Sequence, residues 1–238
     1  MWIKVCGVTR AEDVEAVVHS RADAIGFNFY PGSKRFVSIP HARNLIQVAR
    51  NTTTDLPVLD LVGVFVNADA QMVRRTADET GLSVIQIHGD ETAEQIEEIH
   101  QVCPTLPLIR ALRVDPLNAE RAFEEIDFVC ARVPLAAVLL DAFVPGIFGG
   151  TGQTVEHSVL QRYSERNRPP LLLAGGLTPE NVTEIAGRPG VWGIDTASGV
   201  ESFPGIKNAT LIRKFVNTVR NAISEPGVQH GEIRIGKN

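Results

Sequence analysis

The sequence predicts a closed (β/α)₈ barrel, an α/β fold in which parallel strands alternate with helices. Strand-like and helix-like segments alternate along all 238 residues, in eight units of about 30 residues each. The strand segments are continuous apolar runs, such as residues 62–66 and 171–173, as expected for parallel strands buried on both faces. An open doubly wound sheet is the alternative. The regularity of the units and the absence of an obvious linker favour the closed barrel.

The elements follow from this alternation, in chain order. The predicted strands cover residues 2–6, 23–29, 58–65, 83–87, 107–112, 136–141, 170–174 and 191–195. The predicted helices cover residues 10–20, 40–50, 69–80, 91–101, 116–125, 178–187 and 208–223, with a further short helix at 154–164. The barrel domain is thus expected over residues 1–224. The polar, glycine-containing segment 225–238 is expected to be a loose terminus outside the core.

Several helix starts carry their own signals. Thr9 with Glu12 three residues later has the spacing of a capping box for the first helix. Pro40 suits the first turn of the second helix, and Asp69 is a candidate N-cap for the third. Thr178-Pro179-Glu180 predicts the start of another helix.

Composition limits the classes of function. The chain is 44% hydrophobic and 21% charged, as in ordinary globular proteins. Its net charge of −5 and the absence of a basic run argue against a nucleic-acid partner, although helix N-termini can still bind a phosphorylated small molecule. No apolar stretch approaches the roughly 20 residues of a membrane span, and no signal-peptide core is present at the start. Both a monomer and a homodimer remain open.

The cysteines predict a reducing compartment. There are 3 of them, an odd number, and their spacing fits no metal motif. A cytoplasmic location is therefore expected. Cys103 and Cys130 lie away from the strand ends and are given no role.

Cys6 is the first candidate catalytic residue, because it ends the first strand where a helix follows. In a parallel barrel the active site lies at the carboxyl ends of the strands. A thiol there, near helix N-terminal amides, can be shifted toward the thiolate and act as a base. Lys4 shares a strand face with Cys6, so its ammonium is expected to favour the thiolate. The alternative places Lys4 in a core ion pair with a strand-end carboxylate, and both interpretations can hold together.

Three further side chains are candidates at the same end of the barrel. Asp141 terminates an apolar strand, where a carboxyl tends toward a raised pKa that suits a general acid. Arg35 lies in the loop after the second strand and could hold a substrate carboxylate through a bidentate pair. His88 ends the fourth strand and is expected to orient substrate by hydrogen bonding rather than to catalyse.

Two glycine-containing loops predict a phosphate site. Ala174-Gly175-Gly176 follows the seventh strand, and the eighth strand runs into Asp195-Thr-Ala-Ser198-Gly199. Adjacent loops after strands seven and eight form the phosphate site of phosphate-binding TIM barrels, because glycine lets backbone N–H groups approach the ligand. A third cluster, Phe148-Gly149-Gly150-Thr-Gly152, follows Asp141 and is expected to act as a lid whose amides join this site.

Six sequence motifs, taken together, resemble a known family. They are Lys4-Val-Cys6-Gly7-Val-Thr9, Gly26-Phe-Asn-Phe with Ser33-Lys-Arg35-Phe-Val-Ser38, Gln86-Ile-His88-Gly89-Asp-Glu91, Leu140-Asp141-Ala with Gly149-Gly150-Thr151-Gly152, Ala174-Gly175-Gly176-Leu-Thr-Pro-Glu-Asn181-Val, and Asp195-Thr-Ala-Ser198-Gly199-Val-Glu201 with Pro204-Gly205-Ile-Lys207. Together, in this order over about residues 2–216, they resemble the phosphoribosylanthranilate isomerase family of tryptophan biosynthesis.

The resemblance implies an Amadori rearrangement of N-(5′-phosphoribosyl)anthranilate, from aminoaldose to aminoketose, without a metal or organic cofactor. Asp141 matches the general acid that protonates the ring oxygen, and Cys6 matches the general base that removes the C2 proton. These tasks demand opposite protonation states, hence environments that separate the two pKa values. Arg35 matches the residue that holds the anthranilate carboxylate. The phosphate positions of the family match Gly175, Gly176, Ser198 and Gly199.

The sequence departs from the family pattern in two places. Glu156-His157 stands where the family usually has Asp-Trp, which puts local lid packing in doubt. Ala197-Ser198 stands where Ser-Ser is common, so one hydroxyl contact to phosphate is expected to be missing.

Three other functions fit the sequence less well. The histidine-pathway aminoaldose isomerase typically has a carboxylate where Cys6 stands. Indole-glycerol-phosphate synthase relies on strand-end lysines, and this chain offers only Lys4, deeper in its strand. A non-catalytic phosphate-binding barrel has no need for both Cys6 and Asp141.

Overall fold

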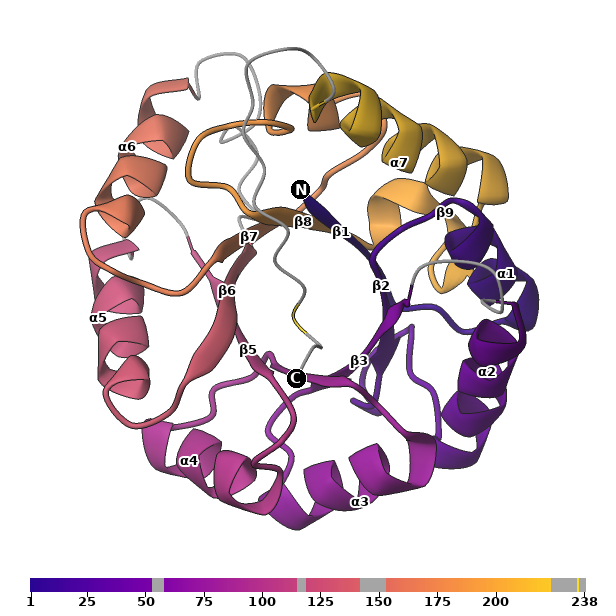
Figure 1. Ribbon diagram of the computed structural model, residues 1–238, viewed down its shortest axis with the longest axis horizontal. Coiled ribbons are helices and arrows are strands. Elements are labelled where there is room, and N and C mark those ends of the chain that lie inside the picture. The colour runs from indigo at the N-terminus through magenta and orange to yellow at the C-terminus, as the bar shows by residue number, and fades with distance from the viewer. Residues whose placement is uncertain (53–57, 115–118, 142–152, 224–234, 236–238) are drawn as a thin grey trace.

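The protein is a closed barrel of parallel strands surrounded by helices, seen as a ring in Figure 1. It is a computed structural model that describes residues 1–52, 58–114, 119–141, 153–223 and 235. The strands neighbour one another in chain order, and the last pairs in parallel with the first. The fold-class prediction is therefore confirmed, and the open sheet is excluded. The strands are β1 Trp2–Cys6, β2 Ala24–Asn28, β3 Asp60–Phe65, β4 Val84–Ile87, β5 Leu108–Arg113, β6 Leu135–Asp141, β7 Leu171–Ala174 and β8 Gly193–Thr196.

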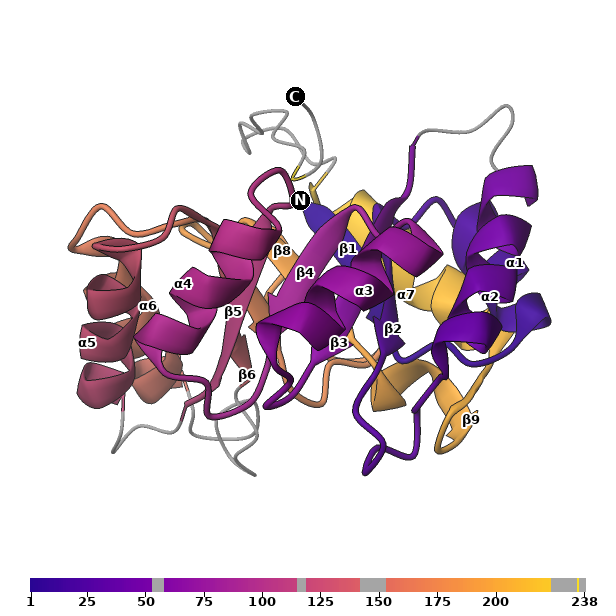
Figure 2. The same cartoon turned by 90° about the horizontal axis from the view of Figure 1, so that it is seen from below.

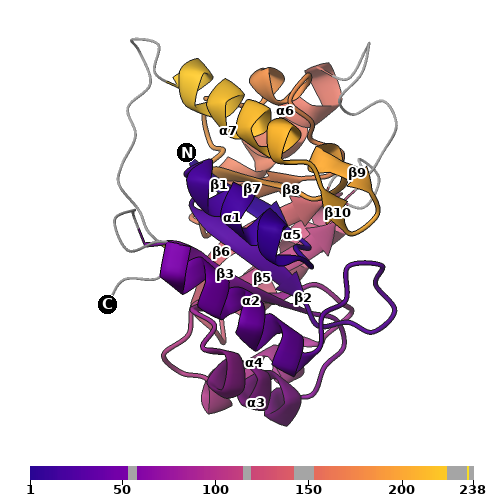
Figure 3. The ribbon, with the colours of Figure 1, turned by 90° about the vertical axis from the view of Figure 1, so that its right-hand side faces the viewer.

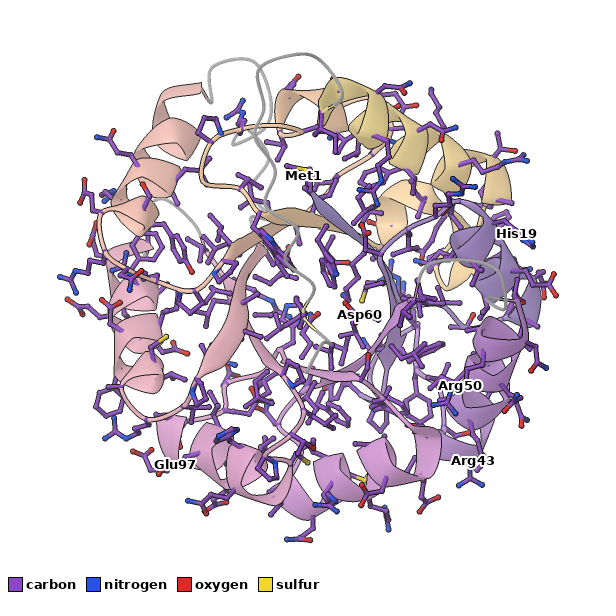
Figure 4. The ribbon with its side chains drawn as sticks, in the orientation of Figure 1. Met1, His19, Arg43, Arg50, Asp60 and Glu97 are labelled. Carbon is purple, nitrogen blue, oxygen red and sulfur yellow. The ribbon has the colours of Figure 1, made fainter. Side chains whose placement is uncertain are left out.

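The helices form the outer layer, as the side view in Figure 2 shows. They are α1 Ala11–His19, α2 Ile39–Thr52, α3 Ala70–Thr80, α4 Ala93–Val102, α5 Ala119–Cys130, α6 Gln153–Ser164 and α7 Ala209–Ile223, with 3₁₀ turns η1 Val182–Glu184 and η2 Ser198–Val200. Figure 4 shows charged side chains of the helices, such as Arg43 and Glu97, on the outer surface, whereas Asp60 lies at the ring of strands. No helix in the described part of the chain is long and apolar enough to cross a membrane.

The inside of the barrel holds an apolar cluster, the floor cluster, which includes the first residues of β1, β2 and β4. The floor cluster consists of Trp2, Ala24, Val62, Val84, Ile109, Ala111, Ala137, Leu139, Leu172, Ala174 and Ile235. Trp2 stacks on Trp192 with ring centroids 5.5 Å apart, and its indole Nε1 donates to Asp60 at 3.1 Å. Side chains on the other face of the strands pack under the helices in a second, larger cluster. Because side chains alternate along a strand, Lys4, Gly26 and Gln86, which lie two places after Trp2, Ala24 and Val84, face the same interior closer to the carboxyl ends.

Some local predictions are confirmed and others are wrong. Asp69 caps α3, accepting from the Met72 amide at 2.7 Å, and Pro40 lies in the first turn of α2. The capping box at the start of α1 is wrong: the N-cap is Arg10, without a side-chain cap bond. Thr9 donates instead to the Gly205 carbonyl at 2.6 Å, a contact from nearly the other end of the chain.

The helix predicted at 178–187 is reduced to the 3₁₀ turn η1. The Asn181 side chain accepts from the Thr178 amide at 2.8 Å and donates to the Gly176 carbonyl at 3.0 Å, which fixes a tight loop at this point. Gly187 adopts φ 82°, a left-handed conformation that ends the segment.

An antiparallel hairpin after β8 was not predicted. It comprises β9 Glu201–Phe203 and β10 Ile206–Lys207 and projects on the mouth side of the barrel, near the loop that follows β2 (Figure 3). Gly205, at φ 83°, forms its turn, and a Cβ there would lie 2.9 Å from the Lys34 carbonyl oxygen. The hairpin therefore packs against the backbone immediately before Arg35.

One residue of the segment 225–238 is described, and it is not outside the core. Ile235 is 8% exposed and belongs to the floor cluster with Trp2 and Ala24. The expectation of a loose terminus is therefore wrong at this residue. Packing in this cluster removes the apolar Ile235 side chain from water.

Candidate active site at the carboxyl ends of the strands

A buried ion pair lies directly above the apolar floor. Lys4 and Asp195 are register partners on β1 and β8, and Lys4 Nζ donates to Asp195 Oδ2 at 2.9 Å. The Lys4 side chain has no exposed surface, and that of Asp195 is 8% exposed. Asp195 Oδ1 is buried without a partner among the described residues. The interpretation of Lys4 as a core ion-pair residue is confirmed.

Cys6 lies on the same face of β1, two residues further toward the mouth. Desolvation raises the pKa of its thiol, and Asp195 raises it further, whereas Lys4 and Lys207 lower it. The net direction is upward from 9.0, away from the thiolate. The Lys4 ammonium acts in the expected direction, but the loss of water around the sulfur outweighs it.

Gly26 makes room for the thiol. It is the register partner of Cys6 on β2, and a Cβ at this position would lie 2.9 Å from Cys6 Sγ and 3.0 Å from Lys4 Cε. Real Cβ atoms do not approach other atoms so closely. The absence of a side chain at Gly26 therefore allows Cys6 Sγ to occupy its position.

Asp141 and His88 come together at the ends of β6 and β4. His88 Nε2 lies 3.7 Å from Asp141 Oδ2, with both side chains about three-quarters buried. Desolvation raises the pKa of Asp141, and the carboxylate of Asp195 adds to the rise, while Arg113 and Lys4 oppose it. This direction agrees with the raised pKa expected for a general acid.

His88 is neutral at pH 7. Desolvation, followed by the charges of Lys4, Arg113 and Arg110, lowers its pKa to about 4. Its Nδ1 lies 3.4 Å from Nε2 of the fully buried Gln86. An amide N–H donated to Nδ1 leaves the proton on Nε2, the nitrogen that faces Asp141.

A network missed by the sequence analysis holds the loop that carries His88. Glu91, 4% exposed, accepts from the Asn67 amide at 2.7 Å and the Gly89 amide at 2.8 Å. Arg110, on β5, donates to Glu91 at 2.9 Å and to the Gly89 carbonyl at 3.0 Å. The available signal was a charged residue inside an otherwise apolar strand, which demands a buried partner.

Arg35 is anchored rather than free. Its Nε and Nη2 both donate to Glu201, at 2.7 Å each, in a bidentate pair. The Arg35 side chain is 26% exposed, and that of Glu201 is 4% exposed. Gly7, at φ 74°, packs against the Arg35 stem, and a Cβ there would collide with Arg35 Cδ. The guanidinium thus lies over the turn that follows Cys6.

The two predicted phosphate loops meet. Thr196 Oγ1 donates to the Leu177 carbonyl at 2.8 Å. A Cβ at Gly199 would clash with the same carbonyl group, so only glycine permits this approach. Gly175 and Gly176 have φ of 100° and 62°, and a Cβ at Gly176 would meet nothing within 4 Å. The loop after β7 therefore presents open backbone beside η2, which begins at Ser198.

Two predicted features cannot be placed. Gly149 and Gly150, with the rest of the expected lid, lie outside the described residues. The same holds for the side chains of Glu156 and His157. Within the described ranges, no group of three or more His, Cys, Asp or Glu side chains could hold a metal ion.

Comparison with known proteins identifies the family. A family model described as N-(5′-phosphoribosyl)anthranilate (PRA) isomerase matches residues 3–218. The N-(5′-phosphoribosyl)anthranilate isomerase of Pseudomonas fluorescens (strain Pf0-1) is 41% identical over 218 residues, 91% of this chain and 97% of that protein.

Solved structures agree. A phosphoribosylanthranilate isomerase in complex with reduced 1-(o-carboxyphenylamino)-1-deoxyribulose 5-phosphate is 32% identical with a TM-score of 0.73, covering 93% of this chain and 99% of that one. Monomers generated from the dimeric isomerase of Thermotoga maritima are 32% identical with a TM-score of 0.72, covering 92% and 98%. The chain therefore belongs to the phosphoribosylanthranilate isomerase family, as its motifs predicted, and it is an enzyme.

Proposed function

We propose that this enzyme converts N-(5′-phosphoribosyl)anthranilate to 1-(2-carboxyphenylamino)-1-deoxyribulose 5-phosphate in tryptophan biosynthesis, with Asp141 as general acid and Cys6 as general base. The acid and base roles are assigned from one observation: two titratable groups lie at the same end of the barrel, at the carboxyl ends of their strands. Asp141 has a raised pKa beside His88, and Cys6 has a thiol beside the Lys4 ammonium. Family membership supplies the substrate.

The first step opens the sugar. Protonated Asp141 donates its proton to the furanose ring oxygen as the C1–O bond breaks, and the anthranilate nitrogen supplies the electron pair that forms the Schiff base. The step leaves Asp141 as a carboxylate. The Nε2–H of neutral His88, 3.7 Å away, stabilises that negative charge without itself titrating at pH 7.

The second step moves the C2 proton. The Cys6 thiolate removes it, the electrons flow to the iminium nitrogen, and the enolamine that forms then tautomerises to the ketone. The Lys4 ammonium lowers the pKa of Cys6 and thus supports the thiolate, against the desolvation that raises it. In the tautomerisation C1 gains one proton and the C2 hydroxyl loses one, both through solvent. Cys6 then releases the proton that it acquired, and Asp141 regains the proton that it lost.

Binding is assigned to both flanks of this pair. The loops that carry Gly175, Gly176, Ser198 and Gly199 offer backbone N–H groups to the 5′-phosphate, where they meet at Leu177. Arg35 holds the anthranilate carboxylate. The buried Oδ1 of Asp195 and Oε1 of Gln86 have no partner among the described residues, and each can accept a hydrogen bond from a sugar hydroxyl.

Turnover tests the proposal directly. Phosphoribosylanthranilate is generated in situ from anthranilate and phosphoribosyl pyrophosphate, and its fluorescence decay is followed for wild type and Asp141→Asn. We expect turnover by wild type and loss of at least about a thousandfold in kcat in the variant. Wild type without turnover on this substrate, but with turnover on the two-phosphate aminoaldose of histidine biosynthesis, would reassign the enzyme.

A cytoplasmic location is part of the proposal, because Cys6, Cys103 and Cys130 are all free thiols. The residues assigned to the reaction all come from one chain. The proposed activity is therefore compatible with a monomer and with a homodimer.

A further inference from the structure

We propose that buried Lys207 is a positioning residue that keeps the Arg35 guanidinium available for a substrate carboxylate, by supplying the second positive charge to Glu201. The inference rests on the proposed function, since Arg35 is assigned there to the anthranilate carboxylate. It concerns a cation that the two proton-transfer steps do not use.

Glu201 is shared by two cations. It accepts from Arg35 Nε and Nη2 at 2.7 Å each, and Lys207 Nζ donates to its Oε1 at 2.8 Å. The Lys207 side chain has no exposed surface, and that of Glu201 is 4% exposed. Glu201 alone would neutralise Arg35. With Lys207 present, two cations share one anion, so the cluster keeps one net positive charge for a ligand.

The geometry leaves the outer edge of Arg35 for that ligand. A guanidinium has five N–H donors, and Glu201 occupies the edge formed by Nε and Nη2. The remaining edge, Nη1 with the second hydrogen of Nη2, belongs to a side chain that is 26% exposed, whereas its partner is almost fully buried. A planar carboxylate can bind there through two parallel hydrogen bonds.

Lys207 is itself held on three sides. Its ammonium also donates to the Ala197 carbonyl at 2.8 Å, in the loop between β8 and η2. Its backbone amide donates to Asp13 at 3.2 Å, and its carbonyl accepts from Arg10 at 3.2 Å. Arg10 and Asp13 form a bidentate pair at 2.6 and 3.0 Å. These contacts hold the Lys207 end of the hairpin against the start of α1, which fixes the backbone that carries the ammonium.

The arrangement links the two binding flanks. Lys207 contacts the loop assigned to the phosphate through Ala197, and Glu201 follows that loop directly and holds Arg35. Burial lowers the pKa of Lys207, and the hydrogen bond to Glu201 opposes this shift. The neighbouring Glu201 carboxylate favours the ammonium form, which donates to both this carboxylate and the Ala197 carbonyl.

The test measures preference for a carboxylate with unreactive ligands, so that the ionisation of Cys6 does not enter. The ligands are reduced 1-(o-carboxyphenylamino)-1-deoxyribulose 5-phosphate and its phenylamino counterpart without the carboxylate, and Kd is measured by calorimetry. The ratio of the two Kd values reports the carboxylate subsite alone, because the phosphate and sugar are common to both. Wild type is expected to prefer the carboxylate ligand.

Substitutions separate charge from shape. Lys207→Gln keeps a hydrogen-bond donor and removes the charge, so the preference should fall on the order of tenfold. Lys207→Arg keeps the charge and should retain most of the preference. In Lys207→Gln with Glu201→Gln, the cluster again carries one positive charge, so the preference should recover by about threefold or more over the single variant. A purely structural role for Lys207 predicts a worse double variant instead.

The outcomes are distinguishable. Equal loss of affinity for both ligands in Lys207→Gln, or an unchanged preference, overturns the inference while the proposed function stands. Wild type that binds both ligands equally overturns the carboxylate role of Arg35 and the inference with it. Thermal melting checks each variant, and if Lys207→Gln does not fold, Glu201→Gln must show a stronger preference than the double variant.

Discussion

Lys4 Nζ and Asp195 Oδ2 lie 2.9 Å apart beneath the catalytic mouth, and this pair acts on both proposed proton-transfer groups. Lys4 lowers the pKa of Cys6 and of Asp141, whereas Asp195 raises both. Because the two charges are adjacent and opposite, their effects largely oppose one another at each site. Desolvation then decides the direction, and both pKa values rise.

Removing Lys4 should show how far its charge offsets that of Asp195. In Lys4→Met the Asp195 carboxylate is left buried without its partner, so the free energy of unfolding should fall by about 3–5 kcal/mol in urea titrations. The pKa of Cys6 should rise further, which slows alkylation of the Cys6 peptide at a fixed pH. Lys4→Met with Asp195→Asn should regain stability, and a single variant as stable as wild type would contradict the ion-pair role.

The pH dependence of kcat/KM should report both groups. Activity needs protonated Asp141 and deprotonated Cys6. The pKa of Asp141 is raised from 3.8 and that of Cys6 from 9.0, so the required acid has the lower pKa of the two. The profile should therefore rise with pH through the Asp141 pKa, stay level, and fall above the Cys6 pKa. Residual activity of Asp141→Asn should instead keep rising toward the thiol pKa. That of Cys6→Ser should decline once Asp141 ionises, with phosphate-ligand affinity little changed.

Gly26→Ala should damage catalysis through the thiol. The new Cβ would lie 2.9 Å from Cys6 Sγ, so the sulfur must move, and kcat should fall on the order of tenfold or more while KM changes little. Gly63→Ala is the matched control, because its Cβ would crowd Leu82 and Phe65 rather than Cys6. It should lower the melting temperature and spare kcat. Equal kcat in the two variants would remove the role of Gly26.

His88 should make stability depend on acid pH. Its pKa is 6.5 in the unfolded chain and about 4 in the folded protein. Above pH 6.5 the imidazole is neutral in both states. As the pH falls from 6.5 to 4, the imidazole is protonated in the unfolded chain but stays neutral in the folded protein. The free energy of unfolding should decrease over this window by up to about 3 kcal/mol. His88→Asn should lose that component, measured by urea unfolding at each pH.

Ile235 should contribute stability but no activity. It packs in the floor cluster, which includes neither Cys6 nor Asp141. Ile235→Asp should lower the free energy of unfolding by about 2 kcal/mol or more, with kcat unchanged. Ile235→Val keeps an apolar side chain and should lose much less. An aspartate variant as stable as wild type would return residues 225–238 to the status of a loose terminus.

The strands could be predicted because continuous apolar runs have one physical solution in an α/β chain, burial on both faces. Helix starts were predictable only where the cap is local. Asp69 caps its own helix, but Thr9 bonds Gly205 instead, a partner 196 residues away. The β9–β10 hairpin was missed, since two- and three-residue strands leave no periodic pattern.

At the site, too, local features could be predicted and long-range partners could not. Sequence position at a strand end was enough to select Cys6, Asp141 and His88. The partners that set their environment were not selected, because Arg35 and Glu201 are 166 residues apart and only the closed barrel joins them. The net direction of the Cys6 pKa could not be predicted for a related reason: a neighbouring charge such as Lys4 can be inferred from strand alternation, but the amount of water lost around the sulfur cannot.

Closure of the barrel by pairing β1 with β8 has a consequence for biosynthesis of the enzyme. During synthesis Lys4 and Cys6 leave the ribosome long before Asp195, Glu201 and Lys207. Until β8 emerges, Lys4 has no buried partner, and Cys6 remains an exposed thiol in a nascent chain. We therefore expect no activity before β8 is made. A polypeptide that stops before β8 contains both Cys6 and Asp141 but does not form the active site.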